Sequence, residues 1–279
     1  MSSALLNPAC LPPAVHPNRH TLPLDERQPS QTKLALVIPT LCEVENISSL
    51  LTRVRTVLDG TGSPYELLIV DDDSQDGTVE RVSALAAEDP RIRLCVRKGE
   101  RGLSGAILHG WQFTDAELLG VMDADLQHPP ELLPYLLTAI QDNHDLAIGS
   151  RYTPGGALRE WNPIRKLLSA AAVWAAWPLQ ASRLRAKDPM SGFFMVRRRC
   201  IDQVQFQRSG FKLLLEILVA GRVDSLQEIP FEFGSRYRGA SKATLKVAID
   251  YAQLLARLYA RKLKSWTSVN SQSPSPSQP

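Results

Sequence analysis

Short apolar runs alternate with segments of helical periodicity through residues 34–149, and this alternation limits the possible fold more than any other feature. The run at 34–38 is continuously apolar, which is typical of a parallel strand covered on both faces. From Val44 to Leu58 apolar residues recur at helical spacing, until Gly60 ends the pattern. Further strands are predicted at 66–70, 92–96, 118–122 and 146–149, and further helices at about 79–86, 103–113 and 130–140. This order predicts an α/β fold with a doubly wound, mostly parallel sheet and helices on both faces.

The two ends of the chain differ in composition from its centre. Residues 1–32 are rich in proline and lack periodicity, so we expect a disordered leader. Residues 266–279 are polar and of low complexity, which predicts a disordered tail. Residues 33–265 are expected to form one domain. The apolar stretch at 167–179 is shorter than the roughly 20 residues of a membrane span, so no such span is predicted.

Charge and cysteine usage exclude several classes of protein. The formal net charge is +3, too small for binding nucleic acid by bulk electrostatics. The four cysteines are isolated in the sequence, which argues against a disulfide scaffold or a structural zinc site and favours the cytoplasm. The glycine patterns of dinucleotide enzymes, P-loop proteins and α/β-hydrolases are absent from the sequence. A cytoplasmic enzyme of another class is therefore expected.

Carboxylates follow two of the predicted strands directly. Asp71, Asp72 and Asp73 follow one strand, while Asp123 and Asp125 follow another in an Asp-x-Asp pattern. Ligands of doubly wound sheets bind beyond the carboxyl ends of the strands, where these side chains are expected. A turn and a helix N-cap would account for Asp73 and its neighbours, but not for the whole acidic group. The Asp-x-Asp pattern favours a hard divalent cation shared with substrate phosphates.

Basic residues occur mainly in the second half of the chain. Any one of them is more often a solvated surface charge than a ligand-binding group. Together with a metal site they are typical of a diphosphate-binding protein, since arginine and lysine pair with phosphate oxygens. The candidates are Arg151, Arg165, Lys212, Arg236 and Lys242. His109 and His128 are interpreted as structural residues, although His128 is close to the predicted metal site.

Seven blocks of sequence follow one another between about residues 34 and 262. They are Ile38-Pro-Thr40 with Glu43-Val-Glu45-Asn46, Val70-Asp-Asp-Asp-Ser74 with Asp76-Gly77-Thr78, Met122-Asp-Ala-Asp-Leu-Gln-His-Pro-Pro130, Ile148-Gly-Ser-Arg-Tyr152, Lys187-Asp-Pro-Met-Ser-Gly-Phe-Phe194, Gly210-Phe-Lys212, and Arg236 with Gly239-Ala-Ser-Lys242. In their order and spacing these blocks resemble the family-two glycosyltransferases of GT-A fold, and among them the polyprenol-phosphate mannosyltransferases. The resemblance implies a GT-A domain at 33–265 with C-terminal amphipathic helices.

The resemblance also implies roles for particular residues. Asp123, Asp125 and Gln127 would hold Mg²⁺ or Mn²⁺ on the donor diphosphate, with Ala124 against the nucleotide. The nucleotide would be held by Pro39, Leu41, Glu43, Val70 and Asp72, and the donor and acceptor phosphates by Arg151, Arg165, Lys212, Arg236 and Lys242. Asp125 and Arg151 would be the catalytic residues. The chain departs from the family where it has Leu41-Cys42 instead of Tyr-Asn and Ala240 instead of Glu.

The implied reaction moves mannose from GDP-mannose to a polyprenyl phosphate, with inversion at the anomeric carbon. A phosphate monoester arrives largely ionised near neutral pH, because its second pKa is about 6, and it needs no general base. Asp188 is a candidate for such a base, but it is equally well interpreted as a turn residue before Pro189. A processive polysaccharide synthase of the same fold normally carries membrane helices and a Gln-x-x-Arg-Trp motif, and the sequence shows neither pattern. Two alternatives remain open: glucosyl transfer from UDP-glucose and a non-catalytic nucleotide-sugar-binding subunit. The last is disfavoured by the intact acidic and basic candidates.

A lipid acceptor implies contact with a membrane. The apolar segment at about 159–185 contains two tryptophans and has basic neighbours, and a second helix is expected at about 243–264. Basic residues beside an apolar, tryptophan-bearing helix favour an interfacial element, although a buried core helix explains the first segment equally well. We expect peripheral association with the cytoplasmic face of a membrane; a separate membrane-anchoring partner stays open.

Overall fold

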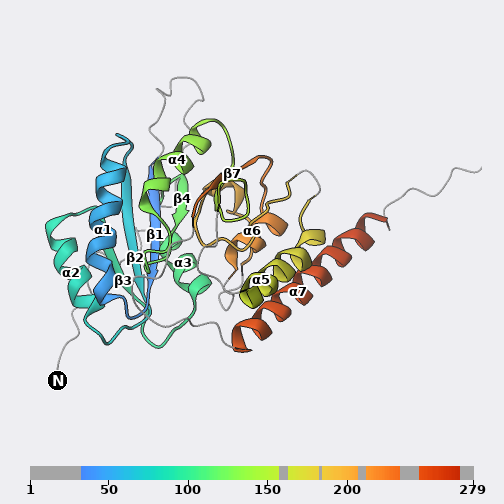
Figure 1. The fold of residues 1–279 in the computed structure, drawn as a ribbon, viewed down its shortest axis with the longest axis horizontal. Helices are drawn as coiled ribbons and strands as arrows, with labels where there is room; N and C mark the ends of the chain where they lie inside the picture. Colours follow the sequence, from blue (N-terminus) through green and yellow to red (C-terminus); the bar gives the residue numbers. More distant parts are fainter. Residues whose placement is uncertain (1–32, 157–162, 182–183, 207–211, 233–244, 271–279) are drawn as a thin grey trace, which may run out of the picture.

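The computed structural model describes residues 33–156, 163–181, 184–206, 212–232 and 245–270. In this part of the chain seven strands form one sheet in the order β3-β2-β1-β4-β6-β5-β7 (Figure 1). Their bounds are β1 Leu34–Thr40, β2 Tyr65–Asp71, β3 Ile92–Val96, β4 Leu118–Val121, β5 Leu146–Ser150, β6 Phe194–Arg197 and β7 Leu226–Pro230. All neighbouring strands are parallel except β6, which runs antiparallel to β4 and β5. The predicted α/β class with a mostly parallel sheet is confirmed.

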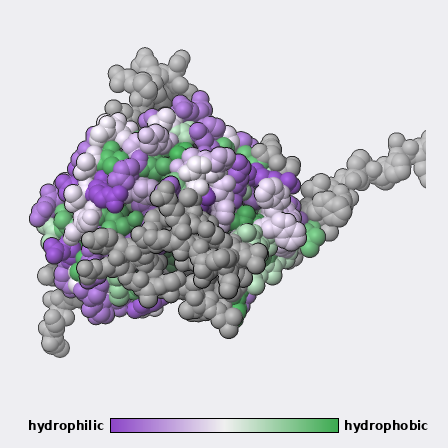
Figure 2. All heavy atoms as spheres, viewed as in Figure 1, coloured by the Kyte–Doolittle hydropathy of each residue, from purple (hydrophilic) through white to green (hydrophobic). Residues whose placement is uncertain are grey.

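Helices cover both faces of the sheet, as the apolar strands require. On one face α1 (Val44–Asp59), α2 (Thr78–Glu88) and α4 (Leu133–Gln141) share a core with alternate residues of β1 and β2. On the other face α3 (Leu103–Gln112) and α6 (Leu213–Ala220) pack against the remaining strand residues. In Figure 2 the surface seen in the same view mixes hydrophilic and hydrophobic residues, as expected for helices with one solvent-facing side.

The last part of the sheet differs from what the sequence patterns predict. They predict none of β6, α6 and β7, although the strands and helices up to β5 agree with the predicted ranges within a few residues. β6 has only four residues, and β7 contains a glutamate and ends in proline. α6 is apolar on almost every side and therefore carries little helical periodicity. β6 and β7 lie in the half of the sheet beyond β4, where β7 is the edge strand, and α6 packs against one face of the sheet.

Two helices form a separate pair beside the sheet. α5 (Pro163–Ala176), continued by the short helix η3 (Trp177–Leu179), lies alongside α7 (Leu245–Asn270) (Figure 1). They share an apolar cluster with α6 that includes Ala176, Leu254 and Leu258. Tyr251 and Tyr259 of α7 donate hydrogen bonds to carbonyl oxygens of α5, at 2.6 and 2.8 Å. The second predicted amphipathic helix is thus present, and it continues to Asn270, past the predicted start of the tail at 266.

None of the helices in the described ranges is both long enough and apolar enough to cross a membrane. The predicted leader at 1–32 lies outside the described residues, and so does the tail beyond Asn270.

Candidate functional site

The carboxyl ends of β1, β2 and β4 meet at one edge of the sheet. In the register of the strands Pro39 is opposite Val70, the N–H of Asp72 donates to the Thr40 carbonyl at 3.0 Å, and the N–H of Met122 donates to Val37 at 3.2 Å. The three loops that follow these strands therefore start side by side. Parallel strands with this topology place their ligand-binding loops at the carboxyl edge.

Each of these three loops contains one non-glycine residue in the left-handed region. The φ angles are 60° at Cys42, 60° at Asp73 and 62° at Leu126. Such conformations are unfavourable for residues with a Cβ, and they persist where the surrounding contacts fix them. Three such residues lie at one edge of the sheet, so contacts between the loops, and not the conformational preferences of single residues, determine the shape of these loops. This is common at binding sites.

Asp71 joins the first two loops and was not among the predicted site residues. Its carboxylate is completely buried and accepts hydrogen bonds from Thr40 Oγ1 (2.8 Å), Ser74 N (2.7 Å) and Ser74 Oγ (2.7 Å). The Ser74 hydroxyl in turn accepts the N–H of Cys42 at 2.8 Å. The first three bonds satisfy the buried carboxylate, and together with the bond from Cys42 they hold the β1 and β2 loops together.

Asp72 is neutralised by an arginine that the sequence patterns do not single out. The Arg97 guanidinium contacts Asp72 Oδ1 at 2.6 and 2.7 Å, and the N–H of Gly102 donates to Oδ2 at 2.8 Å. The two side chains are 3% and 7% exposed, so this ion pair is buried. Asp72 therefore reaches the carboxyl edge as a neutralised hydrogen-bond acceptor. The signal that could have found Arg97 is its position directly after β3.

Glu43 lies at the start of α1, where Asp76 and Thr78 hold the backbone. The N–H of Glu43 donates to Thr78 Oγ1 at 2.9 Å, and that of Val44 donates to Asp76 Oδ2 at 3.2 Å. Asp76 also accepts the N–H of Thr78 at 3.1 Å, which confirms the turn interpretation of this residue. The Glu43 carboxylate accepts from Asn46 Nδ2 at 2.8 Å. Glu43 is thus positioned beside the Asp71–Ser74 contacts.

The Asp-x-Asp segment follows β4 and provides two carboxylates of different exposure. Asp125 is 8% exposed, and its Oδ1 accepts the N–H of Gln127 at 3.2 Å. The Asp123 side chain is 34% exposed. A Cβ at Gly192 would lie 3.2 Å from Asp123 Oδ2, so glycine at 192 leaves room around this carboxylate. Ala124 between them is buried.

His128 fixes the backbone of the Asp-x-Asp segment. Its Nδ1 accepts the N–H of Asp123 at 3.2 Å, and its ring stacks on Phe193 with centroids 5.0 Å apart. Burial lowers the pKa of His128 to about 4, so the ring is neutral near pH 7 and Nδ1 is able to accept. The structural interpretation of His128 is supported by these contacts.

The donor set of this segment fits a divalent cation bound partly by substrate. Within the described ranges no group of three or more His, Cys, Asp or Glu residues could hold a metal by protein ligands alone. Asp123 and Asp125 supply hard oxygen ligands, and hard cations such as Mg²⁺ and Mn²⁺ are commonly bound by one or two carboxylates plus phosphate oxygens. The segment therefore suits a cation that arrives with a phosphate-bearing ligand.

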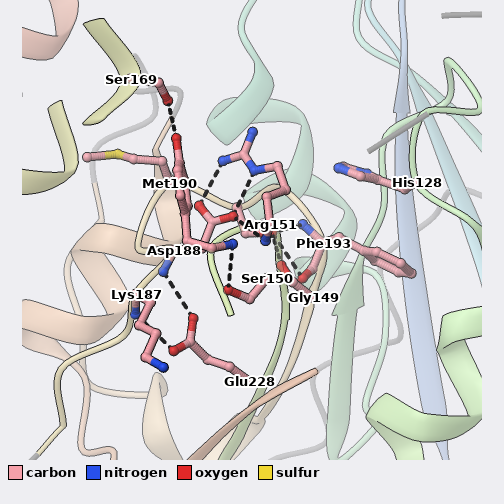
Figure 3. Close-up of polar contacts among 12 residues, drawn as sticks. His128, Gly149, Ser150, Arg151, Ser169, Lys187, Asp188, Met190, Phe193 and Glu228 are labelled. Carbon is pink, nitrogen blue, oxygen red and sulfur yellow. Dashed lines mark hydrogen bonds and ion pairs between the residues drawn. The ribbon is translucent and has the colours of Figure 1, made fainter. Parts of the chain in front are cut away.

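On the opposite side of the Asp-x-Asp segment Arg151 follows β5 and is paired with Asp188. Arg151 Nε and Nη2 donate to the two oxygens of Asp188, each at 2.7 Å, and the N–H of Arg151 donates to Oδ2 at 3.1 Å (Figure 3). The Arg151 side chain is 10% exposed and that of Asp188 is fully buried. Burial disfavours the guanidinium charge, but the hydrogen bonds and the charge of Asp188 outweigh it and raise the pKa of Arg151. Asp188 is thereby engaged as a partner of Arg151.

Lys212 completes the described cationic part of the site. Its Nζ donates to the Met190 carbonyl at 3.3 Å. Burial and the charge of Arg151 lower the pKa of Lys212 to about 8, while Asp123 and Asp188 act in the opposite direction. Lys212 is therefore close enough to Arg151 and Asp123 for the charges of both to affect its pKa.

The structure thus gathers most of the predicted site residues at one edge of the sheet. The gathered residues are Pro39, Leu41, Glu43, Val70, Asp72, Asp123, Ala124, Asp125, Gln127, Arg151 and Lys212. Arg236 and Lys242 lie outside the described residues, as does the side chain of Arg165. Their proposed phosphate contacts stay predictions.

The sequence of this chain is similar to a family of known proteins. A model of "Glycosyl transferase family 2" matches residues 35–205. A dolichol-phosphate mannosyltransferase of Pyrococcus furiosus is 40% identical over 81% of this chain and 63% of its own length. A dolichol-phosphate mannosyltransferase of Saccharomyces cerevisiae is 40% identical over 82% of this chain and 87% of its own. The chain thus spans less than two thirds of the archaeal relative and most of the yeast one.

Among solved structures, a glucosyl-3-phosphoglycerate synthase from Mycobacterium tuberculosis, in complex with Mn²⁺, UDP-glucose and phosphoglyceric acid, superposes with a TM-score of 0.58. Its sequence is 18% identical, and the match covers 82% of this chain and 79% of the other. At this level of identity the likeness concerns the fold.

Proposed function

This chain belongs to glycosyl transferase family 2, and on that premise we propose that it moves mannose from GDP-mannose to a polyprenyl phosphate. The observation that carries the proposal is one edge of the sheet where the Asp123 carboxylate, two residues before Asp125, lies within the electrostatic reach of the cations Arg151 and Lys212. A transfer between two phosphate-bearing substrates requires such a combination. The high identity to dolichol-phosphate mannosyltransferases supports mannose and a polyprenyl phosphate as the substrates.

The nucleotide would lie over the ends of β1 and β2. Pro39, Leu41 and Val70 offer backbone and apolar contacts there, and Glu43 and Asp72 offer acceptors for the guanine or ribose. Because Arg97 already neutralises Asp72, a neutral donor such as a ribose hydroxyl suits it better than a cation. Leu41 replaces the tyrosine usual in this family, so base packing at this position depends on an aliphatic side chain.

Asp123 and Asp125, with Gln127 nearby, would hold Mg²⁺ or Mn²⁺ on the diphosphate. When bound, the cation neutralises the charge that grows on the leaving diphosphate as the sugar bond breaks. The chain's own contribution is to fix the carboxylates: Gln127 N–H binds Asp125, and His128 binds the backbone of Asp123. Preorganised ligands need no rearrangement during the reaction.

Arg151 and Lys212 would align the acceptor phosphate, joined by Arg165, Arg236 and Lys242. The phosphate oxygen attacks the anomeric carbon, the bond from that carbon to the diphosphate oxygen breaks, and its electron pair leaves with GDP, giving inversion. The ionised phosphate needs no general base. The pairing of both Asp188 oxygens with Arg151 favours a role for Asp188 in orienting that arginine over proton transfer. Asp125 and Arg151 are accordingly the proposed catalytic residues.

The α5–α7 pair would contact the cytoplasmic face of the membrane that holds the lipid. Trp174 is 79% exposed and Leu263 62% exposed, while the Arg185 guanidinium lies 5.3 Å from the Trp177 ring centroid. Exposed aromatic and aliphatic side chains beside cations suit the headgroup region of an anionic bilayer. Ser169 of α5 accepts a hydrogen bond from the Tyr152 hydroxyl at 2.7 Å, so this helix is tied to the residue next to Arg151.

Two other functions are separable by one assay. Glucosyl transfer from UDP-glucose uses the same acceptor chemistry, and a nucleotide-sugar-binding subunit would bind a donor without transferring its sugar. Purified protein is incubated with Mn²⁺ or Mg²⁺, a polyprenyl phosphate and either GDP-mannose or UDP-glucose. Mannosyl lipid from the first donor supports the proposal; glucosyl lipid from the second, or donor binding without a lipid product, supports an alternative.

A further inference from the structure

Glu228 of the edge strand β7 holds the backbone of the loop that carries Asp188. Its Oε2 accepts the N–H of Lys187 at 2.9 Å, and its Oε1 accepts the N–H of Asp188 at 3.0 Å (Figure 3). One carboxylate thus binds two successive amide groups that are about 40 residues away in the sequence. Hydrogen bonds to a charged acceptor are stronger than those between neutral groups.

The Asp188 side chain passes this constraint to Arg151. Asp188 is fully buried, and its two oxygens accept three hydrogen bonds from Arg151, two from the guanidinium and one from the backbone. Because the guanidinium is planar, a bidentate pair fixes its direction as well as its position. The direction of the Asp188 carboxylate depends on the backbone that Glu228 holds.

The far end of the same loop is fixed separately. Ser191 Oγ donates to the Gly149 carbonyl at 2.7 Å, and the N–H of Gly149 donates to the Phe193 carbonyl at 2.8 Å. At the near end Glu228 binds the N–H groups of residues 187 and 188, next to Ala186, whose N–H and carbonyl bind the Gln180 side chain at 2.9 and 3.4 Å. The register of β7 with β5, in which Glu228 is opposite Ile148, places the carboxylate three residues before Arg151 on the neighbouring strand.

We infer that Glu228 is a positioning residue for sugar transfer: it holds the 187–188 backbone so that Asp188 aims the Arg151 guanidinium at the acceptor phosphate. The inference rests on the function proposed above. Only a carboxylate offers two acceptors to two adjacent N–H groups, whereas an amide would turn its NH₂ toward one of them. An ill-directed Arg151 still carries its charge, so turnover should suffer more than substrate binding.

The test is a double-mutant cycle with Glu228→Gln and Arg151→Lys in the full chain. Lysine keeps the charge at 151 but loses the bidentate pair, so it removes what Glu228 is inferred to maintain. We expect Glu228→Gln alone to lower kcat about tenfold, with GDP affinity within twofold. In the Arg151→Lys background the same change should lower kcat by less than twofold.

Controls separate positioning from stability. Gln227→Ala changes the exposed neighbour on β7 and should leave kcat unchanged. Hydrogen exchange at the Lys187 and Asp188 amides should accelerate in Glu228→Gln. If that variant does not fold, Glu228→Asp, which keeps the charge with a shorter reach, takes its place in the cycle.

Equal losses of kcat in both backgrounds would overturn the inference, and so would a lower Tm with unchanged kcat. A wild-type protein that binds GDP-mannose but transfers no sugar contradicts the proposed function instead. The two failures are thereby distinguished.

Discussion

The part of the site that we propose for the donor (the donor side) and the part that we propose for the acceptor (the acceptor side) are held in different ways. On the donor side, loops that follow the adjacent parallel strands β1, β2 and β4 bind one another through buried carboxylates such as Asp71. On the acceptor side, Arg151 is paired with Asp188 from a loop before the antiparallel strand β6, and the backbone of Asp188 binds Glu228 of the edge strand β7. Arg97 neutralises the acid Asp72 on the donor side, and Asp188 neutralises the cation Arg151 on the acceptor side. On each side a charged residue of the site is thus already held by an oppositely charged residue of the protein before a substrate binds.

The largest effect is expected where the two sides meet. Asp125→Asn removes the charge of a proposed metal ligand while an amide oxygen still accepts the Gln127 N–H, so the fold should persist. We expect transfer to fall about 10³-fold, comparable to losing a main source of transition-state charge stabilisation. Excess chelator should reproduce the loss in the wild type, and Mn²⁺ or Mg²⁺ should reverse it. Full activity in chelator would refute the metal's role.

On the donor side, a substitution should act mainly by lowering the free energy of unfolding. Arg97→Leu leaves the Asp72 charge buried without its partner, which costs about 3 kcal/mol of unfolding free energy. Denaturant unfolding monitored by fluorescence measures this cost, and GDP affinity should weaken in parallel. As a control, Arg53→Leu removes the partner of Glu131 in an exposed pair and should cost less than about 1 kcal/mol. Equal losses of unfolding free energy in the two variants would show that burial does not make the Arg97–Asp72 pair more costly to break.

The acceptor side should respond to alkaline pH. The pKa of Lys212 is lowered to about 8, so this cation is charged below that pH and lost as the pH rises through it. We expect kcat/KM for the polyprenyl phosphate to fall tenfold per pH unit above about 8. Lys212→Arg, whose charge persists, should remove this limb of the profile. An unchanged limb would assign it to another group.

The smallest effect is expected at the membrane contact. Trp174→Ala should lower binding to anionic vesicles about fivefold, or about 1 kcal/mol, because an exposed tryptophan loses its place in the interface. Cosedimentation measures it, and added salt should release the wild type because it screens exposed charges. Tyr135→Ala, an exposed aromatic on α4, is the matched control and should have no effect. Equal losses for both would argue against a specific contact by α5.

The difference between the two sides also explains what the sequence could predict. Apolar runs and acidic strand ends such as Asp123 and Asp125 are local patterns, and parallel topology alone brings them to one edge. Arg97 and Glu228 act through contacts that span 25 and about 40 residues, which no local pattern records. β6 and β7 are too short or too polar to give a periodic signal, so the frame around Arg151 was missed. Arg151 and Lys212 were identified as candidate phosphate ligands from the basic residues of the second half of the chain, and the family resemblance then gave them specific roles.

The most direct test of the account is the identity of the sugar that reaches the lipid. The purified full chain is given GDP-mannose or UDP-glucose with a polyprenyl phosphate and Mn²⁺ or Mg²⁺, and the lipid product is identified by mass spectrometry and its anomeric configuration by NMR. We expect a polyprenyl β-mannosyl phosphate that forms only from GDP-mannose and disappears with Asp125→Asn. A glucosyl product, an α-linked mannose, or no lipid product from either donor would contradict it.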